Sequence, residues 1–205
     1  MENNVQVTIE NLFRNNMAGY YVESVMKLHE LLRELMPEGQ TIGCGDSITL
    51  EQTGVLDYVR NHKYNFLDKY RDGLQHEDKR ELYLQSFRAD TFLTGVNAVT
   101  INGELFNIDG NGSRVAPIIY GPKQVIAVAG TNKIVRTVDD AILRTRQIAA
   151  PLDAKRLGKE TPCTKLNKCI DCRHPQRICN DFVLITNQFE KQRIKIILIE
   201  GNYGY

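Results

Sequence analysis

The amino-acid sequence predicts an α/β domain built on a mainly parallel sheet. Short apolar runs alternate with helical patterns along most of the chain, as strands and helices do in α/β folds. Residues 124–129 are almost entirely apolar, as expected for a strand covered on both faces of a parallel sheet. Several apolar runs end in glycine, asparagine, serine or aspartate, which are the residues that form loops at strand ends.

Composition predicts one domain over residues 1–205, since 205 residues are enough for one well-buried core. Lys and Arg number 26 against 25 Asp and Glu, whereas nucleic-acid-binding proteins usually carry a clear basic excess. No apolar run approaches the roughly 20 residues that a membrane-spanning helix needs. The first residues do not have the pattern of a secretory signal. We therefore expect a soluble cytoplasmic protein that binds neither nucleic acid nor membranes.

The first helical pattern covers residues 10–36. Pro37 and Gly39 end it. We expect one long helix or a helix pair there, so that residues 1–38 form an N-terminal helical segment. The apolar and aromatic residues that recur at steps of three or four, and so share one helical face, are Met17, Tyr21, Val25, Leu28, Leu32 and Leu35.

A glycine-rich turn ends the next predicted strand, within residues 41–49. Thr49 and Gln52 have the pattern of a capping box, which predicts a helix over about residues 50–61. A strand, a turn and a helix N-terminus in this order can bind an anion, because free backbone N–H groups and the helix dipole favour negative charge. Ile48 replaces the third glycine of the dinucleotide-binding pattern, so the sequence does not predict an NAD site.

The following patterns predict a strand near residues 64–67, a helix over about 75–88 and a strand over 90–94. Asn102-Gly103 is a favoured turn dipeptide and predicts a hairpin between residues 98–101 and 104–108. After the strand at 124–129, Thr137 is expected to cap a helix that Pro151 ends. Residues 152–180 read as a cysteine-rich insertion. The apolar runs 182–186 and 194–199 read as two neighbouring strands.

Three polar loops, at residues 43–49, 95–97 and 109–114, each follow a predicted strand. We expect them to converge at one edge of the sheet, where the carboxyl ends of parallel strands meet and where open α/β sheets bind ligands. Asp109 is a candidate base and Arg114 a candidate two-point partner for a carboxylate or phosphate. For the loop at residues 109–114, the alternative is a tight structural turn that binds no ligand. The predicted ligand-binding residues are Gly43, Gly45, Ser47, Thr49, Gly95, Asn97, Asp109, Gly110, Asn111, Gly112 and Arg114.

Four of the five cysteines crowd into a C-x5-C-x2-C-x6-C pattern, formed by Cys163, Cys169, Cys172 and Cys179. Such a cluster in a reducing compartment is typical of a metal or redox site rather than a disulfide framework. Structural zinc more often pairs two C-x2-C turns, so the single one here favours a four-iron cluster (4Fe-4S). Zinc, disulfides and free thiols remain the alternatives. Cys44 lacks an identifiable catalytic partner and is expected to be a small buried side chain.

Specific motifs resemble the lactate-utilisation (LUD) domain family over nearly the whole chain. They are the Gly-x-Gly-x-Ser-x-Thr turn from Gly43, Phe-Leu-Thr-Gly-Val-Asn-Ala-Val-Thr from Phe92, Ile-Asp-Gly-Asn-Gly-Ser-Arg ending at Arg114, and Val-Ile-Ala-Val-Ala-Gly-Thr-Asn-Lys from Val125. The resemblance implies a three-layer α/β/α sandwich similar to ribose-5-phosphate isomerase, glucosamine-6-phosphate isomerase and the CoA transferases. It also implies that the first turn occupies the position of their phosphate- or substrate-binding turn.

Some members of that family belong to a multi-subunit system, with iron–sulfur partners, that oxidises L-lactate to pyruvate. The four-cysteine segment is a departure from the small subunit of that system, and resembles a branch of stand-alone proteins. The leading hypothesis is a protein of lactate or organic-acid metabolism that binds a small anionic metabolite and an iron–sulfur cluster, with a redox partner protein. The alternatives are a non-redox sugar-phosphate isomerase or acyl/CoA-transfer enzyme with structural zinc, and a non-catalytic accessory subunit.

Overall fold

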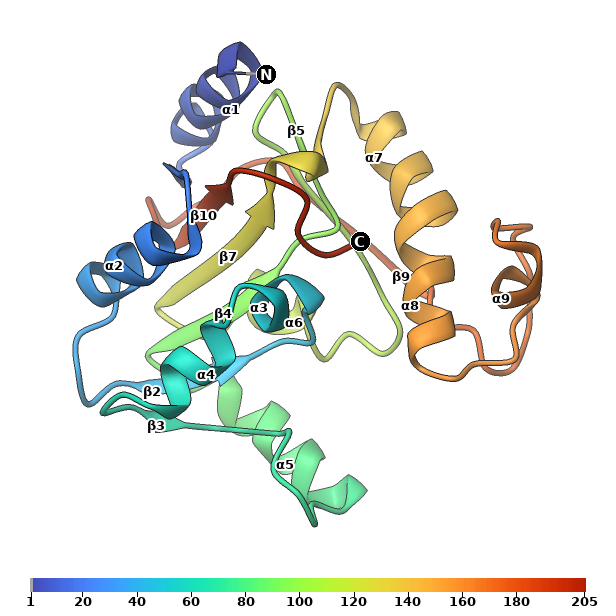
Figure 1. Cartoon of the computed structure of the whole chain (residues 1–205), viewed down its shortest axis with the longest axis horizontal. Helices are drawn as coiled ribbons and strands as arrows, with labels where there is room; N and C mark the ends of the chain where they lie inside the picture. The colour runs from blue at the N-terminus through green and yellow to red at the C-terminus, as the bar shows by residue number, and fades with distance from the viewer. Residues whose placement is uncertain (1) are drawn as a thin grey trace.

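The computed structural model describes residues 2–205, which fold around two sheets (Figure 1). The strands are β1 (Ala18–Val22), β2 (Thr41–Cys44), β3 (Asn65–Phe66), β4 (Thr91–Gly95), β5 (Ala98–Thr100), β6 (Leu105–Asp109), β7 (Gln124–Gly130), β8 (Ile134–Val135), β9 (Asp181–Ile185) and β10 (Ile194–Ile199). The α-helices are α1 (Glu2–Arg14), α2 (Val25–Leu35), α3 (Ile48–Gln52), α4 (Val55–Arg60), α5 (His76–Ser86), α6 (Val115–Ile119), α7 (Val138–Arg144), α8 (Ala150–Arg156) and α9 (Pro162–Leu166). A 3-10 helix, η1, spans Thr131–Lys133, and a π-helix, η2, spans Thr145–Ala149.

The larger sheet has six parallel strands in the order β1-β10-β7-β4-β2-β3. The central strand β7 is paired on both sides and is buried from Val125 to Gly130, which explains its continuous apolar sequence. Because all six strands run the same way, their carboxyl ends lie along one edge. The predicted α/β fold with a mainly parallel sheet is confirmed.

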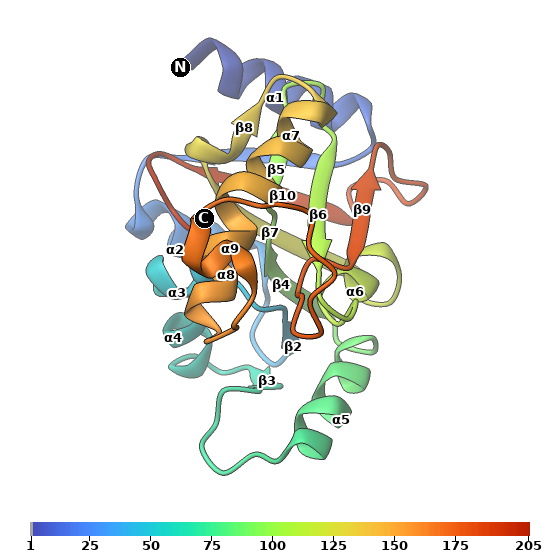
Figure 2. The same ribbon diagram turned by 90° about the vertical axis from the view of Figure 1, so that its right-hand side faces the viewer.

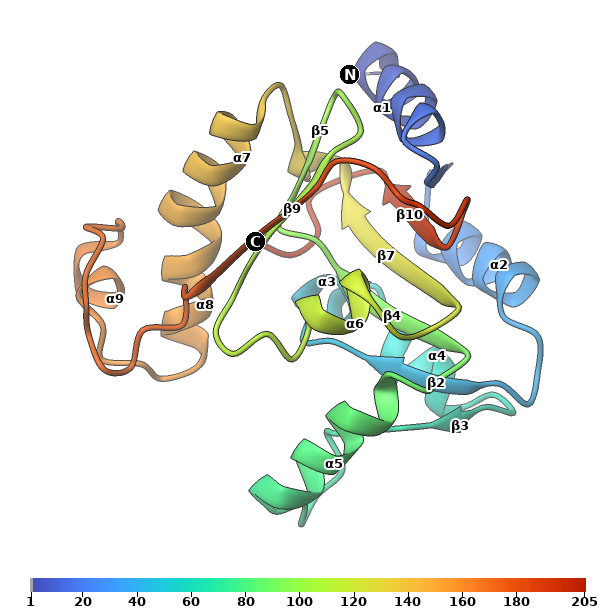
Figure 3. The same cartoon turned by 180° about the vertical axis from the view of Figure 1, so that it is seen from behind.

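Helices cover both faces of this sheet, in keeping with the expected sandwich. On one face, α2, α3 and α4 pack through a core that includes Leu28, Leu50 and Val59 (Figure 1). On the other face, α1 and α6 pack through a second core that includes Leu12 and Ile118, as the view from behind shows (Figure 3). No helix among residues 2–205 is both long and apolar enough to cross a membrane.

A second sheet, in the order β8-β5-β6-β9, was not anticipated (Figure 2). The predicted hairpin through Asn102-Gly103 is confirmed, since β5 and β6 pair antiparallel. The expectation that residues 182–186 and 194–199 are neighbouring strands is wrong. β9 pairs with β6 in the small sheet, whereas β10 lies between β1 and β7 in the large one. The loop between them moves the chain from one sheet to the other.

The predicted helix or helix pair over residues 10–36 is wrong at β1, which separates α1 from α2. Tyr21 fits the helical spacing, but pairing with β10 places residues 18–22 in the sheet. Gly19 lets α1 pack closely on this strand, because a Cβ there would meet the Ile9 Cα at 3.1 Å. Tertiary pairing has overridden the local helical pattern.

The helix after Thr137 begins as predicted, since the Thr137 side chain accepts a hydrogen bond from the Asp140 N–H. The prediction that Pro151 ends it is wrong: the chain continues through the π-turn η2 into α8 as one helical column (Figure 1). The Ala150 N–H bonds to the Thr145 carbonyl, a five-residue step that changes the register just before the proline. Pro151 then stands in the first turn of α8, where its missing N–H costs little.

The helix predicted over 50–61 is present as α3 and α4, which Gly54 separates in the left-handed conformation at φ 65°. The capping residue is Ser47 rather than Thr49, because the Ser47 side chain accepts the Leu50 N–H. Thr49 is instead fully buried. The strands near 64–67 and 90–94 and the helix near 75–88 are present as β3, β4 and α5.

Candidate functional site

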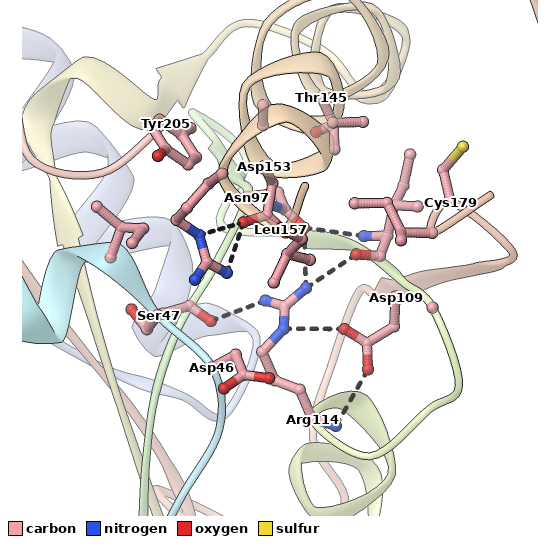
Figure 4. A pocket seen from close by; sticks show the side chains of 18 of the residues that line it. Asp46, Ser47, Asn97, Asp109, Arg114, Thr145, Asp153, Leu157, Cys179 and Tyr205 are labelled. Carbon is pink, nitrogen blue, oxygen red and sulfur yellow. Dashed lines mark hydrogen bonds and ion pairs between the residues drawn. The ribbon is translucent and has the colours of Figure 1, made fainter. Parts of the chain in front are cut away.

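A cleft of about 590 Å³ lies at the edge of the large sheet where its parallel strands end. The loops after β2, β4, β7 and β10 border it, together with the loop after β6 and helix α8 (Figure 4). Such an edge is where open α/β sheets usually bind ligands. The predicted loops do converge here, and the predicted residues that line the cleft are Ser47, Gly95, Asn97, Asp109, Gly110, Asn111 and Arg114.

Arg114 joins the loops after β4 and β6. Its side chain is buried, and Nε donates to the Asp109 carboxylate at 3.0 Å. A guanidinium has five N–H groups, and the other four are also donated within the protein. Their acceptors are the Gly95 carbonyl, the Asn107 and Asn97 side-chain oxygens and the Ile108 carbonyl, at 2.8–3.2 Å.

Asp109 is as fully engaged as Arg114 (Figure 4). One carboxylate oxygen accepts from Arg114 Nε, and the other accepts from the backbone N–H groups of Arg114 and Val115. A base needs a free oxygen within reach of the proton that it removes. In this arrangement, Asp109 and Arg114 hold the shape of the cleft, and a ligand reaches the Arg114 guanidinium only by displacing an internal hydrogen bond.

The glycines of the first two loops allow this close packing. A Cβ on Gly45 would lie 2.7 Å from Arg114 Cγ, and one on Gly95 would lie 2.5 Å from Ser47 Oγ. A Cβ on Gly43 would meet Ser86 Oγ at 2.7 Å, so this glycine packs against α5 and not against the cleft. Helix α3 has only five residues, so its dipole adds little to anion binding here.

Four of the predicted residues do not line the cleft: Gly43, Gly45, Thr49 and Gly112. Thr49 lies beneath its surface, where its hydroxyl contacts Lys133 Nζ at 2.9 Å. Gly112 provides a left-handed turn, at φ 77°, in the loop before α6. The predicted set therefore contains residues that face the cleft and residues that support it.

Several charged residues of the cleft were not predicted, although Asp46 and Lys133 both follow predicted strands. Asp46 pairs with Lys69 at 2.8 Å and accepts a hydrogen bond from Tyr70. Burial opposes its ionisation, but these two partners outweigh burial and hold the pKa of Asp46 below its ordinary value. On α8, Asp153 pairs with Arg156 at 2.7 Å. Asp46 and Lys133 could have been predicted by the rule that was used for the three loops, because polar residues that follow buried strands meet at one edge of the sheet.

The four clustered cysteines line one small cavity between α8, α9 and the segment that follows α9. Cys169 Sγ accepts from Arg146 Nη2 at 3.6 Å and from the Asp171 backbone N–H at 3.4 Å. All four are of intermediate exposure, and none of them forms a disulfide within the described residues. Apolar side chains also line the cavity: Pro151, Ala154, Ile170 and Ile178.

The chemistry of this cavity fits a sulfur-ligated group. Four thiols surround it, N–H groups point at one sulfur, and Arg146 and Arg177 supply positive charge beside it. Among the described residues, no group of three or more histidine, cysteine or acidic side chains is gathered closely enough to hold a metal ion. A single zinc ion needs its sulfurs about 2.3 Å from one point.

The model of the LUD domain family matches residues 5–199. The chain belongs to the LUD domain family. Its fold is similar to the crystal structure of a DUF162 family protein from Deinococcus radiodurans, at 12% identity and a TM-score of 0.55, with 98% of each chain covered. No curated protein matches the sequence.

More distant likenesses cover about half of this LUD-domain chain. eIF2B beta from Chaetomium thermophilum is 14% identical with a TM-score of 0.37, covering 57% of this chain and 44% of that one. Ribose 5-phosphate isomerase A from Neisseria gonorrhoeae is 14% identical with a TM-score of 0.33, covering 54% and 52%.

The cleft and the cysteine cavity of this LUD domain share a wall. Ala150, Arg177, Ile178 and Cys179 line both. Arg177 also spans the cysteine segment, since it donates to the Cys172 and Cys179 carbonyls at 2.5 and 2.8 Å. A ligand in the cleft and a group in the cavity would thus be separated by one layer of side chains.

Proposed function

We propose that this LUD-domain protein acts in lactate or organic-acid metabolism by binding a small organic-acid anion in the cleft beside an iron–sulfur cluster. The cluster would be held by Cys163, Cys169, Cys172 and Cys179. Membership of the LUD family supports a role related to lactate utilisation. The observation that carries the rest of the proposal is the shared wall between the cleft and the cysteine cavity.

A cluster bound at these cysteines would supply one-electron chemistry, whose potential depends on burial and on hydrogen bonds to the sulfurs. Arg146 and the Asp171 backbone N–H already donate to Cys169 Sγ. The chain's own contribution is to position the anion, shield the cavity with apolar side chains and hold positive charge at the wall through Arg177. We further propose that a soluble redox partner exchanges electrons with the cavity in the cytoplasm.

The non-redox alternative is weaker on one specific observation. An isomerase or transferase of this fold would need a free base, and the candidate for that role was Asp109. Its carboxylate accepts three hydrogen bonds from Arg114 and Val115. The geometry therefore favours a structural role for Asp109 over proton transfer.

Anaerobic purification with iron and acid-labile sulfide analysis tests the cluster. We expect about four iron and four sulfide per chain and a brown colour. Cys169→Ser should lose most of the iron. The matched control Cys44→Ala should keep it, because Cys44 is buried in the core between the large sheet and helices α2, α3 and α4, and not at the cysteine cavity. Zinc in place of iron would favour the non-redox alternative. Full iron retention by Cys169→Ser would contradict the assignment of this ligand.

A further inference from the structure

Lys133 is a buried lysine in the cleft wall without an acidic partner. It ends η1, directly after the central strand β7, and is 5% exposed. Nζ contacts Thr49 Oγ1 at 2.9 Å and the Val96 carbonyl at 3.1 Å. Both are neutral acceptors, and no carboxylate of residues 2–205 forms an ion pair with this ammonium group. Lysine is rarely buried in this way unless it is paired or functional.

Two guanidinium groups lie near enough to Lys133 to act on its charge. Burial, reinforced by the guanidinium groups of Arg144 and Arg114, lowers the pKa of Lys133 to about 7. Arg144 comes from α7 and donates to the Asn97 and Tyr205 carbonyls. The other charged residues of the cleft wall are Asp46, Asp109, Asp153, Arg156, Lys159 and Arg177.

The acids of the cleft wall are already matched with cations. Asp46 pairs with Lys69, and Asp109 pairs with Arg114. Asp153 in turn pairs with Arg156 on the same helix. No cleft-wall acid is therefore left to balance the charge that Lys133 carries when it is protonated, and a bound anion could do so.

The hydrogen bonds of Lys133 fit a neutral amine in the empty cleft. A neutral amine has two N–H groups, and Nζ has two acceptors, Thr49 Oγ1 and the Val96 carbonyl. Protonation adds a third N–H, for which the described residues provide no acceptor. A bound anion would supply both that acceptor and the opposite charge, so binding and protonation would favour each other.

We propose that Lys133 is the anion-binding residue of the cleft and takes up one proton from solvent when a carboxylate ligand binds. The carboxylate class rests on the proposed function. The step is an ion pairing with no covalent change: the amine gains a proton and the ligand carboxylate accepts the resulting N–H. Arg114, whose donors are all engaged, then shapes the cleft while Lys133 contacts the ligand.

Calorimetric titration with L-lactate, pyruvate and inorganic phosphate at pH 8, in buffers of different ionisation enthalpy, tests this inference. Because the pKa of Lys133 is lowered toward neutrality, much of this side chain is deprotonated there before binding, so carboxylate binding should be accompanied by proton uptake. Lys133→Met should weaken binding at least about tenfold and abolish uptake. Lys133→Arg, which is always charged, should bind without uptake and remains informative if the methionine variant does not fold. The control Lys195→Met, at the opposite end of the sheet on β10, should keep both ligand binding and proton uptake.

The outcomes separate this inference from the proposed function. Carboxylate binding without proton uptake, or with uptake that survives Lys133→Met, overturns the role of Lys133 and leaves the ligand class intact. Phosphate binding with uptake that needs Lys133, and no carboxylate binding, supports Lys133 as the anion-binding residue and overturns the carboxylate class. Failure of all three probes to bind counts against both.

Discussion

Replacing Arg114 by methionine should destabilise the protein strongly, because the side chain connects three segments at the cleft. The change removes five side-chain hydrogen bonds and leaves the Asp109 carboxylate, which is about 10% exposed, without its cation. Charged hydrogen bonds contribute about 1.5–3 kcal/mol each, but they are not additive within one network. Asn97 and Asn107 keep another donor to the same oxygen, from Ile108 N–H and Asn97 N–H respectively.

The better guide is the cost of breaking a buried ion pair, about 3–5 kcal/mol. For a chain of this size, such a loss lowers the melting temperature by roughly 6–20 °C. Urea unfolding and calorimetry of Arg114→Met measure both quantities. The matched control is Arg136→Met, whose ion pair with Asp140 is exposed and should contribute less than about 1 kcal/mol. Equal losses in the two variants would refute a structural role for Arg114.

Three further changes test the same region. Gly45→Ala places a Cβ 2.7 Å from Arg114 Cγ and should lower the unfolding free energy, measured in urea, by about 1–3 kcal/mol. The control Gly110→Ala, whose Cβ has its nearest contact at 3.4 Å, should lower it less. Equal losses would contradict the packing argument. The pKa of Lys133 falls from 10.5 in the unfolded chain to about 7 in the fold, so between these pH values the unfolded state binds more protons and the unfolding free energy should rise with pH by up to about 1.4 kcal/mol per unit. Lys133→Met should lack that rise. If the unfolding free energies of the wild type and of Lys133→Met changed in parallel with pH, the lowered pKa of Lys133 would be contradicted. The pKa of Asp46 is lowered in the fold, so its stabilisation is present above about pH 4 and lost as pH falls through the folded-state pKa. Its side chain is half exposed, so Asp46→Asn should lose less than about 1 kcal/mol at pH 7 and progressively less at more acidic pH.

Features that depend on local sequence were predictable. The continuous apolar run at β7, the Asn102-Gly103 hairpin and the Thr137 cap each depend on neighbours in the chain, and each is present. The short spacing of the cysteines likewise predicted that they share a site, and all four line one cavity.

Features that depend on distant contacts were not predictable from one sequence. β1 follows a helical spacing and is recognisable as a strand only through its pairing with β10. β9 and β10 are close in sequence, yet they join different sheets. The lowered pKa of Lys133 comes first from its burial and then from Arg144 and Arg114, which the fold brings near it from α7 and from the loop before α6.

The sequence also could not show that all five N–H groups of the Arg114 guanidinium are donated within the protein. Its acceptors belong to the loop after β4 and to β6, and only their convergence shows that no donor remains for a ligand. The prediction placed this loop at the edge of the sheet where the structure has it, bordering the cleft. Assigning its residues to ligand contact or to support required the three-dimensional arrangement.

The measurement that tests the account most directly is the electron paramagnetic resonance spectrum of the anaerobically purified, reduced protein during titration with pyruvate. Because Cys179 and Arg177 line both the cleft and the cysteine cavity, we predict an iron–sulfur signal that shifts as the cleft fills, with the same affinity that calorimetry gives. An iron-free protein, or a signal unchanged at saturating pyruvate, would contradict the account.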